Sequence, residues 1–169
     1  FPGLLKTCTL GYDGKGQFVL QNKEETSELE IDFDKEYILE KKVNLKKEIS
    51  VIITRFINND FITYEPIENF HINQMLSRSI IPADINKDIF EKAQQQAKLI
   101  AEKLDYIGTM CVEYFIDEKN NLLVNEIAPR VHNSGHLTIN THNVSQFENH
   151  VRAVCNLKKI ELIKNYNAE

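Results

Sequence analysis

The chain has 169 residues, with 20 Lys and Arg against 25 Asp and Glu, and its formal net charge at pH 7 is −5. This length suits one domain or a large piece of one. An apolar share of 42% and a charged share of 27% are typical of a globular protein and exclude disordered and collagen-like chains. No apolar run is long enough for a membrane helix, and no basic stripe favours nucleic acid. We therefore expect neither a membrane nor nucleic acid as a partner.

The three cysteines, Cys8, Cys111 and Cys155, are far apart and include no CxxC pair. This spacing favours neither a disulfide framework nor a zinc site, so it predicts a reducing, cytoplasmic setting. Cys111 lies in an apolar run and is expected to be a buried, small hydrophobic residue. The chain begins with Phe1 and not with Met, which predicts that it is a piece of a longer protein.

The first forty residues are predicted to form short strands around a glycine-rich loop. Residues 4–8, 18–20 and 37–39 have the composition of strands, and the acidic segment 23–33 is predicted to form a short helix. Residues 11–17 hold three of the six glycines, which interrupt regular structure. Such a loop either wraps phosphates through its backbone N–H groups or is a plain surface hairpin.

The remainder of the chain alternates hairpin and helix patterns. β-Branched residues around turn residues predict two hairpins, and apolar residues at helical spacing predict two helices. The predicted elements are a hairpin of 49–56 and 61–64, a helix over 87–104, a hairpin of 108–116 and 122–127, a loop over 128–144, and a helix over 146–155 capped by Ser145. This mixture predicts an α+β fold with a largely antiparallel sheet.

Two glutamates face one another in the second predicted hairpin. A two-residue turn at Lys119-Asn120 places Glu113 directly opposite Glu126, and like charges in such a pair destabilise a sheet. Either one carboxylate holds a proton, or a cation lies between them. Mg²⁺ fits because it prefers oxygen ligands. The alternative is a pair of solvent-facing glutamates on an ordinary hairpin, and a shift in register by one residue would remove the pairing.

Polar and small residues crowd the segment 125–136, Asn-Glu-Ile-Ala-Pro-Arg-Val-His-Asn-Ser-Gly-His, at the end of a predicted strand. Two histidines, an arginine and two asparagines within twelve residues favour a catalytic or binding loop over a structural one. His142 and His150 lie outside this segment and are expected on the surface.

Taken together, these segments resemble the ATP-grasp family, and within it the ligases that carboxylate an aminoimidazole ribonucleotide. The matching stretches are LLKT, GYDGKGQ, the E-x-x-V segment with Glu48, EISVI, IENFH, the strand that carries Glu113, NEIAPRVHNSGH and SQFENHVRAV. The resemblance implies an ATP-grasp fold with flanking helices, a small glycine-loop lid subdomain over 1–43 and a large subdomain over 44–169 that carries the Mg–ATP and substrate loop. The family's N-terminal and C-terminal domains would lie outside these residues.

The resemblance also implies roles for individual residues. Lys6 resembles a phosphate-binding lysine, and a loop that closes over the triphosphate is implied for Gly11, Tyr12, Asp13, Gly14, Lys15, Gly16 and Gln17. Further nucleotide contacts are implied for the hinge residues Glu40, Lys41, Lys42 and Val43, for Glu48 at the ribose, and for His71, Asn125 and Glu126. Metal binding is implied for Glu113 and Glu126. Contacts with the ribonucleotide and the carboxylation chemistry are implied for Tyr12, Asp13, Arg130, His132 and Asn133.

By this resemblance, the protein is an ATP-grasp ligase of purine biosynthesis. It would join bicarbonate to the amine of 5-aminoimidazole ribonucleotide through carboxyphosphate, with Asp13 or His132 accepting the amine proton, and would release ADP and phosphate. ATP and Mg²⁺, or Mn²⁺, are the implied cofactors, and the full-length enzyme would be a homodimer, whereas the piece alone is expected to be inactive. Two alternatives stay open: another ATP-grasp ligase with a different acid or amine, and a non-catalytic nucleotide-binding module.

Overall fold

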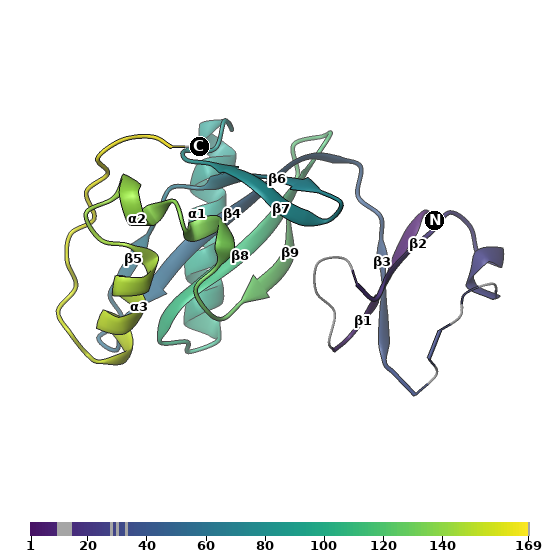
Figure 1. The fold of residues 1–169 in the computed structure, drawn as a ribbon, viewed down its shortest axis with the longest axis horizontal. Coiled ribbons are helices and arrows are strands. Elements are labelled where there is room, and N and C mark those ends of the chain that lie inside the picture. The colour runs from purple at the N-terminus through teal and green to yellow at the C-terminus, as the bar shows by residue number, and fades with distance from the viewer. Residues whose placement is uncertain (10–14, 28, 30, 33, 169) are drawn as a thin grey trace. The chain divides into compact units, whose positions relative to one another are not determined.

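Residue contacts divide the chain into two compact units. The computed structural model describes residues 1–9, 15–27, 29, 31–32 and 34–168. Unit 1 comprises Phe1–Asn44 together with His71–Met75, and unit 2 comprises Leu45–Phe70 together with Leu76–Glu169 (Figure 1). Unit 1 thus includes His71–Met75, a segment outside the small subdomain over 1–43 that was predicted from the sequence.

Unit 1 contains a three-stranded antiparallel sheet in the order β2-β1-β3. Its strands are β1 (Gly3–Thr7), β2 (Gln17–Leu20) and β3 (Tyr37–Lys41). The helix expected over 23–33 is wrong in extent, because among the described residues of that segment only the 3₁₀ turn η1 (Glu24–Ser27) is helical. Further along, the Asp32 carboxylate accepts a hydrogen bond from the Asp34 backbone N–H, a local turn that competes with helix formation.

Unit 2 contains a six-stranded antiparallel sheet, which confirms the predicted α+β class. The strand order is β7-β6-β4-β8-β9, and β5 also pairs with β4. The strands are β4 (Leu45–Arg55), β5 (Phe61–Thr63), β6 (Ile67–Ile72), β7 (Met75–Ile80), β8 (Gly108–Asp117) and β9 (Leu122–Ala128). Both predicted hairpins, β4–β5 and β8–β9, are confirmed.

The β6–β7 hairpin was not predicted from the sequence. Its turn residues, Asn73 and Gln74, have φ angles of 51° and 66°. Two successive residues with positive φ are typical of a type I′ hairpin turn, which usually carries glycine at the second position. Because Gln74 stands there, the strongest short-range signal for this hairpin is missing from the sequence.

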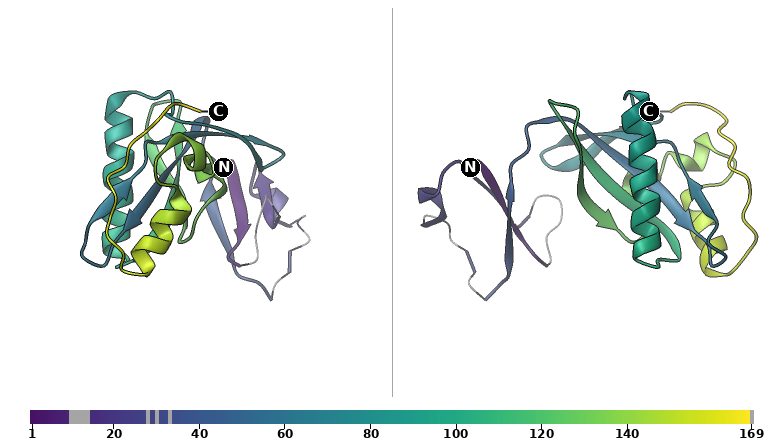
Figure 2. Two further views of the ribbon diagram at one scale, coloured as in Figure 1. Left: turned by 60° about the vertical axis from the view of Figure 1, so that its left-hand side comes forward. Right: turned by 180° about the vertical axis from the view of Figure 1, so that it is seen from behind.

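Helices cover the two faces of the six-stranded sheet (Figure 2). Helix α1 (Lys87–Lys103) packs one face of the sheet through Ile89, Ala93, Ala97 and Ala101, which are all buried. Alternation along the central strands turns Val51 and Ile53 of β4, with Met110, Val112 and Tyr114 of β8, toward this helix. The opposite face packs Ile52, Phe56, Tyr64 and Cys111 with Ala153 of α3 (Gln146–Val154).

Local capping explains where the helices begin. The Asn86 side chain accepts a hydrogen bond from the Ile89 backbone N–H at 2.8 Å, and Ser145 caps α3 through the Glu148 N–H, as predicted. Leu104, expected on the buried face of α1, is instead 57% exposed because the helix has ended at Lys103. No helix among the described residues is long and apolar enough to cross a membrane.

Candidate active site

Two carboxylates oppose one another on neighbouring central strands. Glu113 of β8 pairs directly with Glu126 of β9, as the sequence predicted. Directly opposed side chains lie on the same face of the sheet. This is the face away from α1, since Glu113 alternates with Val112 and Tyr114, which pack on that helix. The pair therefore concentrates negative charge on one face of unit 2.

The pairing arises from a β-bulge and not from a two-residue turn. Near the turn Ile116 pairs with Leu122 and Tyr114 with Val124, which is one residue away from the predicted register. The register then shifts between Glu113 and Tyr114, so that Asn125 is the extra residue of β9. Simple alternation would have put Glu126 on the face of Leu122 and Val124, and the bulge moves it to the other face.

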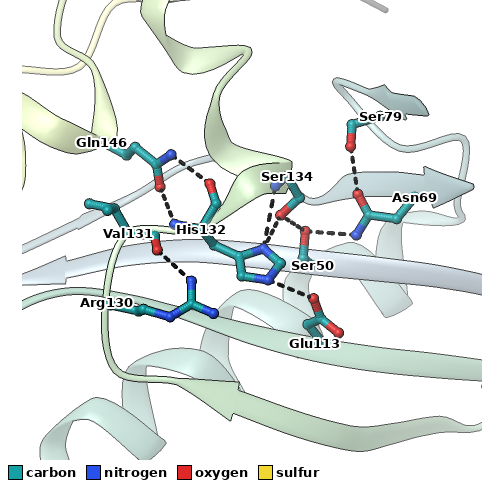
Figure 3. A network of polar contacts seen from close by, with 9 residues as sticks. All are labelled: Ser50, Asn69, Ser79, Glu113, Arg130, Val131, His132, Ser134 and Gln146. Atoms are coloured by element: carbon teal, nitrogen blue, oxygen red, sulfur yellow. Dashed lines mark hydrogen bonds and ion pairs between the residues drawn. The ribbon is translucent and has the colours of Figure 1, made fainter. Parts of the chain in front are cut away.

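The ring of His132 lies between Glu113 and Ser134 (Figure 3). Its Nε2 atom is 3.1 Å from Glu113 Oε1, and the two side chains are only 13% and 16% exposed. Its Nδ1 atom is 2.9 Å from Ser134 Oγ and also accepts a hydrogen bond from the Ser134 backbone N–H at 3.3 Å. His132 thereby caps the short 3₁₀ turn η2 (Asn133–Gly135), which the sequence analysis treated as loop.

A chain of buried hydroxyl and amide groups continues from Ser134 across the sheet (Figure 3). Ser50 of β4 donates to Ser134 Oγ at 2.8 Å, and Asn69 of β6 donates to Ser50 Oγ at 2.9 Å. Ser79 of β7 in turn donates to Asn69 Oδ1 at 2.9 Å. Sequence reasoning missed Ser50, Asn69 and Ser79, because single serines and asparagines in strands carry no distinctive local signal.

Gln146, the first residue of α3, holds the His132 segment in place. Its side-chain Oε1 accepts from the His132 N–H at 3.0 Å, and its Nε2 donates to the His132 carbonyl at 2.7 Å. A Cβ on Gly135 would lie 2.5 Å from Gln146 Oε1, so only glycine allows this approach. Both residues are fully buried, and the backbone around His132 is therefore held by a side chain from a distant helix.

Beside this segment lies a cavity of about 660 Å³. It is lined by Leu76, Ser77, Arg78, Ser79, Asn133, Ser134, His136 and Leu137. Asn133 is exposed at its edge, and the Arg78 guanidinium lies 4.4 Å from the centre of the Phe70 ring. Arg130 is also exposed, and it donates to the carbonyl of its neighbour Val131 at 2.9 Å. One cationic side chain, that of Arg78, therefore lines the cavity beside the polar segment.

Potential metal ligands cluster around Glu113 on this face of unit 2. One ligand atom each from Cys111, Glu113 and His132 lie within 4.8 Å of one another. Burial raises the pKa of the Cys111 thiol, and the neighbouring Glu113 charge raises it further, which disfavours the thiolate form that binds metal ions. Glu113 and Glu126 each offer two carboxylate oxygens. This donor set fits a hard divalent cation such as Mg²⁺.

Glu48 lies on the same face of the sheet as the carboxylate pair. It pairs with Phe115 of β8 and with Asn69 of β6, and Phe115 is two residues from Glu113. The Glu48 side chain is half-buried. The structure thus places Glu48, Glu113 and Glu126 on one face of the unit 2 sheet, with His132 bonded to Glu113 and Asn125 next to Glu126 in the bulge.

Apart from Arg130 and Asn133, which also lie in unit 2, the remaining expected residues belong to unit 1. Lys6 of β1 forms an ion pair with Glu40 of β3, at 2.7 Å between Nζ and Oε2. Lys41 ends β3, the Lys42 N–H donates to the Pro2 carbonyl at 3.1 Å, and Val43 is half-buried. His71 is half-buried at the end of β6 and groups with unit 1.

The glycine-rich loop is described only in part. Gly11, Tyr12, Asp13 and Gly14 lie outside the described residues. Lys15 and Gly16 form a turn that leads into Gln17, the first residue of β2. Gly16 has a φ of 77°, and a Cβ there would lie 2.5 Å from Thr7 Oγ1, so this position requires glycine.

A family model of the ATP-grasp domain matches residues 1–147. The chain belongs to the ATP-grasp family. N5-carboxyaminoimidazole ribonucleotide synthase of Bacillus subtilis (strain 168) is 45% identical to it over 166 residues, which are 96% of this chain and 44% of that protein. This ATP-grasp chain therefore spans about 44% of the length of the curated relatives it matches.

Solved structures resemble this ATP-grasp chain over nearly its whole length. N5-carboxyaminoimidazole synthetase from Staphylococcus aureus, complexed with ADP, superimposes with a TM-score of 0.92 at 40% identity, covering 99% of this chain and 45% of that one. N5-carboxyaminoimidazole synthase from Aspergillus clavatus, in complex with ADP and 5-aminoimidazole ribonucleotide, superimposes with a TM-score of 0.84 at 29% identity, covering 95% and 42%. The antiparallel sheets with flanking helices match this fold.

Proposed function

We propose that this chain is the ATP-grasp portion of an N5-carboxyaminoimidazole ribonucleotide synthase. In the whole protein, ATP would drive the carboxylation of 5-aminoimidazole ribonucleotide by bicarbonate. One structural observation carries the proposal: two opposed carboxylates, Glu113 and Glu126, lie on one sheet face with His132 bonded to the first of them. The similarity to relatives of that name, which extends over 96% of the chain, supports the choice of substrates.

The proposed reaction has two steps because bicarbonate is a poor electrophile. A bicarbonate oxygen attacks the γ-phosphorus of ATP, the bond to ADP breaks, and carboxyphosphate forms. The ribonucleotide amine then attacks the carboxyl carbon, phosphate leaves, and the amine gives up a proton to a base. The protein must place the reactants in line and stabilise negative charge on the transferring phosphoryl group.

Residues of unit 2 would provide the metal and nucleotide contacts. Glu113 and Glu126 would hold Mg²⁺, or Mn²⁺, with Asn125 as a further polar group beside them. When bound, the cation would neutralise the charge that develops on the phosphoryl oxygens. Glu48 would accept hydrogen bonds from the ribose hydroxyls, since a carboxylate is a pure acceptor. Arg130 would pair with bicarbonate or phosphate through two parallel hydrogen bonds.

Residues of unit 1 would bind the rest of the nucleotide. Lys6 would contact a phosphate, and Glu40 to Val43 with His71 would line the base. The ion pair with Glu40 holds the Lys6 ammonium group at β3, the neighbouring strand of the unit 1 sheet. The role of residues 11–17 in closing over the triphosphate and excluding water stays a prediction, as do the homodimer and the cytoplasmic setting.

The test is phosphate release by the full-length protein. ATP, Mg²⁺, bicarbonate and 5-aminoimidazole ribonucleotide should together release phosphate, and leaving out the ribonucleotide should reduce that release to a slow background. A carboxylated product should appear in proportion to phosphate. Turnover with a different amine or acid, and none with bicarbonate and 5-aminoimidazole ribonucleotide, would favour another ATP-grasp ligase. Nucleotide binding without any turnover would favour a non-catalytic module, and either result would contradict the proposal.

A further inference from the structure

The buried chain of polar groups that leads to His132 is more elaborate than metal binding alone requires. Ser50 and Ser134 are fully buried and Asn69 is 6% exposed. A buried hydroxyl or amide destabilises a fold unless it is hydrogen-bonded, and each of these groups has its partners. The groups come from three different parts of unit 2, namely β4, β6 and the segment after β9.

The Ser134 backbone N–H determines which groups donate and which accept in this series of hydrogen bonds. Its N–H points at Nδ1 of His132 at 3.3 Å. A backbone N–H can only donate, so Nδ1 must accept and carries no proton. The position of the proton on a neutral imidazole is set by the bond that the other ring nitrogen makes.

The side chains reinforce the same direction. Asn69 donates to Ser50, and Ser50 donates to Ser134 Oγ. With its oxygen accepting from Ser50, the Ser134 hydroxyl directs its own proton to Nδ1 of His132, 2.9 Å away. Every donor along the chain therefore points toward the imidazole, and the ring proton is left on Nε2.

We infer that Ser134, oriented by Ser50 and Asn69, is a positioning residue that holds His132 in its Nε2–H tautomer and thereby orients the Glu113 carboxylate. Nε2 lies 3.1 Å from Glu113 Oε1, so the proton points at the carboxylate. Carboxylates that bind metal ions are themselves oriented by hydrogen bonds of this kind. Insofar as the inference concerns the cation and the amine, it rests on the proposed function.

This tautomer also assigns the proton chemistry of the proposed reaction. The Nδ1 lone pair accepts from Ser134, and Nε2 carries a proton that is donated to Glu113. His132 in this state is a donor that positions Glu113 and is not the acceptor of the amine proton.

Nitrogen NMR tests the tautomer in the chain without any ligand. Long-range ¹H–¹⁵N correlation spectra distinguish a protonated from an unprotonated ring nitrogen, and the signals that vanish in His132→Gln identify this ring among the five histidines. We expect Nε2 protonated and Nδ1 unprotonated. A proton found on Nδ1 would overturn the inference, and this measurement needs no variant of Ser134.

Substitutions of the residues in this series of hydrogen bonds then test the positioning role of Ser134. Ser134→Ala should shift the ring signals toward a mixture of tautomers and weaken Mn²⁺ binding by about tenfold or more, the usual cost of losing such a supporting bond. Ser50→Ala should act in the same direction with a smaller effect. Thr54→Val is the control, because Thr54 is also a buried hydroxyl of β4 and bonds Thr109 of β8 at 2.7 Å, outside this series of hydrogen bonds. It should leave the ring signals and Mn²⁺ binding unchanged.

The outcomes separate this inference from the proposed function. Wild-type ring signals and Mn²⁺ affinity in Ser134→Ala would overturn the inference even if the full-length enzyme carboxylates its substrate. If Ser134→Ala does not fold, Ser50→Ala and the wild-type spectrum decide the matter. Conversely, an Nε2–H tautomer that depends on Ser134 would stand even if phosphate release showed a different ligase.

Discussion

The two units bury their residues very differently. In unit 2 a six-stranded sheet lies between α1 and α3, and Ile52, Ile53 and Met110 are fully buried. In unit 1, Leu20 is the one buried apolar side chain among the described residues, whereas Ile38 and Leu39 are 49% and 54% exposed. A three-stranded sheet without a covering layer has little apolar surface with which to stabilise itself. Unit 2 is therefore the stable platform, and the carboxylate pair with its supporting hydrogen bonds lies on it.

Shortening one apolar side chain in each unit should show the largest difference between the two units. Ile53→Ala should lower the free energy of unfolding by about 2–5 kcal/mol, since it leaves a cavity between the sheet and α1. Leu39→Ala in unit 1 is the matched control and should change it by at most about 0.5 kcal/mol, because the side chain is half exposed. Urea denaturation of both variants measures the difference. Equal losses would contradict the assignment of stability to unit 2.

The carboxylate pair should show the next largest effect. Glu126→Gln and Glu113→Gln should each weaken Mg²⁺-dependent ATP binding at least tenfold, or about 1.4 kcal/mol, because each removes one charge from the same site. Folding should be retained, since one of two like charges on a sheet is removed. Calorimetry with Glu118→Gln, in the exposed turn between β8 and β9, provides the control. Unchanged affinity in both site variants would remove the metal assignment.

Kinetics should separate nucleotide recognition from chemistry within unit 2. In the full-length enzyme, Glu48→Ala should raise the KM for ATP several-fold, because its proposed contact is with the ribose alone. Arg130→Ala should instead lower kcat and leave the KM for ATP near the wild-type value. Glu102→Ala, exposed on α1, serves as control. A normal kcat for Arg130→Ala would show that this arginine takes no part in the reaction.

The ion pair of unit 1 should contribute little to stability. Glu40 is 36% exposed and Lys6 18% exposed, and partly exposed pairs contribute about 0–1 kcal/mol. Glu40→Gln should therefore leave the denaturation midpoint nearly unchanged, and its effect should shrink further at high salt. A loss above about 2 kcal/mol would mean that unit 1 depends on this pair far more than its exposure suggests.

A pH effect should come from His142 in unit 2, which is buried and not on the surface as the sequence suggested. Burial lowers its pKa, Glu65 opposes that shift, and Lys164 adds to it. Because the unfolded chain binds this proton more readily than the folded one, stability is full above the ordinary pKa of about 6.5 and falls as the pH drops below it.

Denaturation at pH 7.5 and 5.5 should therefore show a loss of stability on acidification that is smaller in His142→Phe. Phenylalanine keeps a ring against Tyr64, whose centre lies 5.0 Å from that of His142, but cannot take up a proton. An identical pH dependence in both proteins would exclude His142 as the source.

Local patterns in the sequence were enough to predict the elements that rely on short-range physics. Apolar spacing identified α1, and Ser145 identified the start of α3. The prediction failed where the determining contact is distant or the local signal atypical. The turn Asn73-Gln74 lacks its usual glycine, and buried His142 packs against Tyr64, which is far away in the sequence.

The site divides in the same way. The sequence by itself was enough to nominate the residues that are proposed to carry the chemistry. Hairpin pairing singled out Glu113 and Glu126, and the polar segment 125–136 singled out His132. Only the tertiary structure decided how they meet. Near the turn, β8 and β9 pair in a register that would not place Glu113 opposite Glu126, and the bulge at Asn125 shifts the register so that the two glutamates meet. The hydrogen bonds from Asn69 through Ser50 to Ser134 require β6, β4 and the η2 turn to lie side by side. Hydrogen bonds between segments tens of residues apart leave no periodic or local trace in a sequence, so their direction can be determined only once the chain has folded.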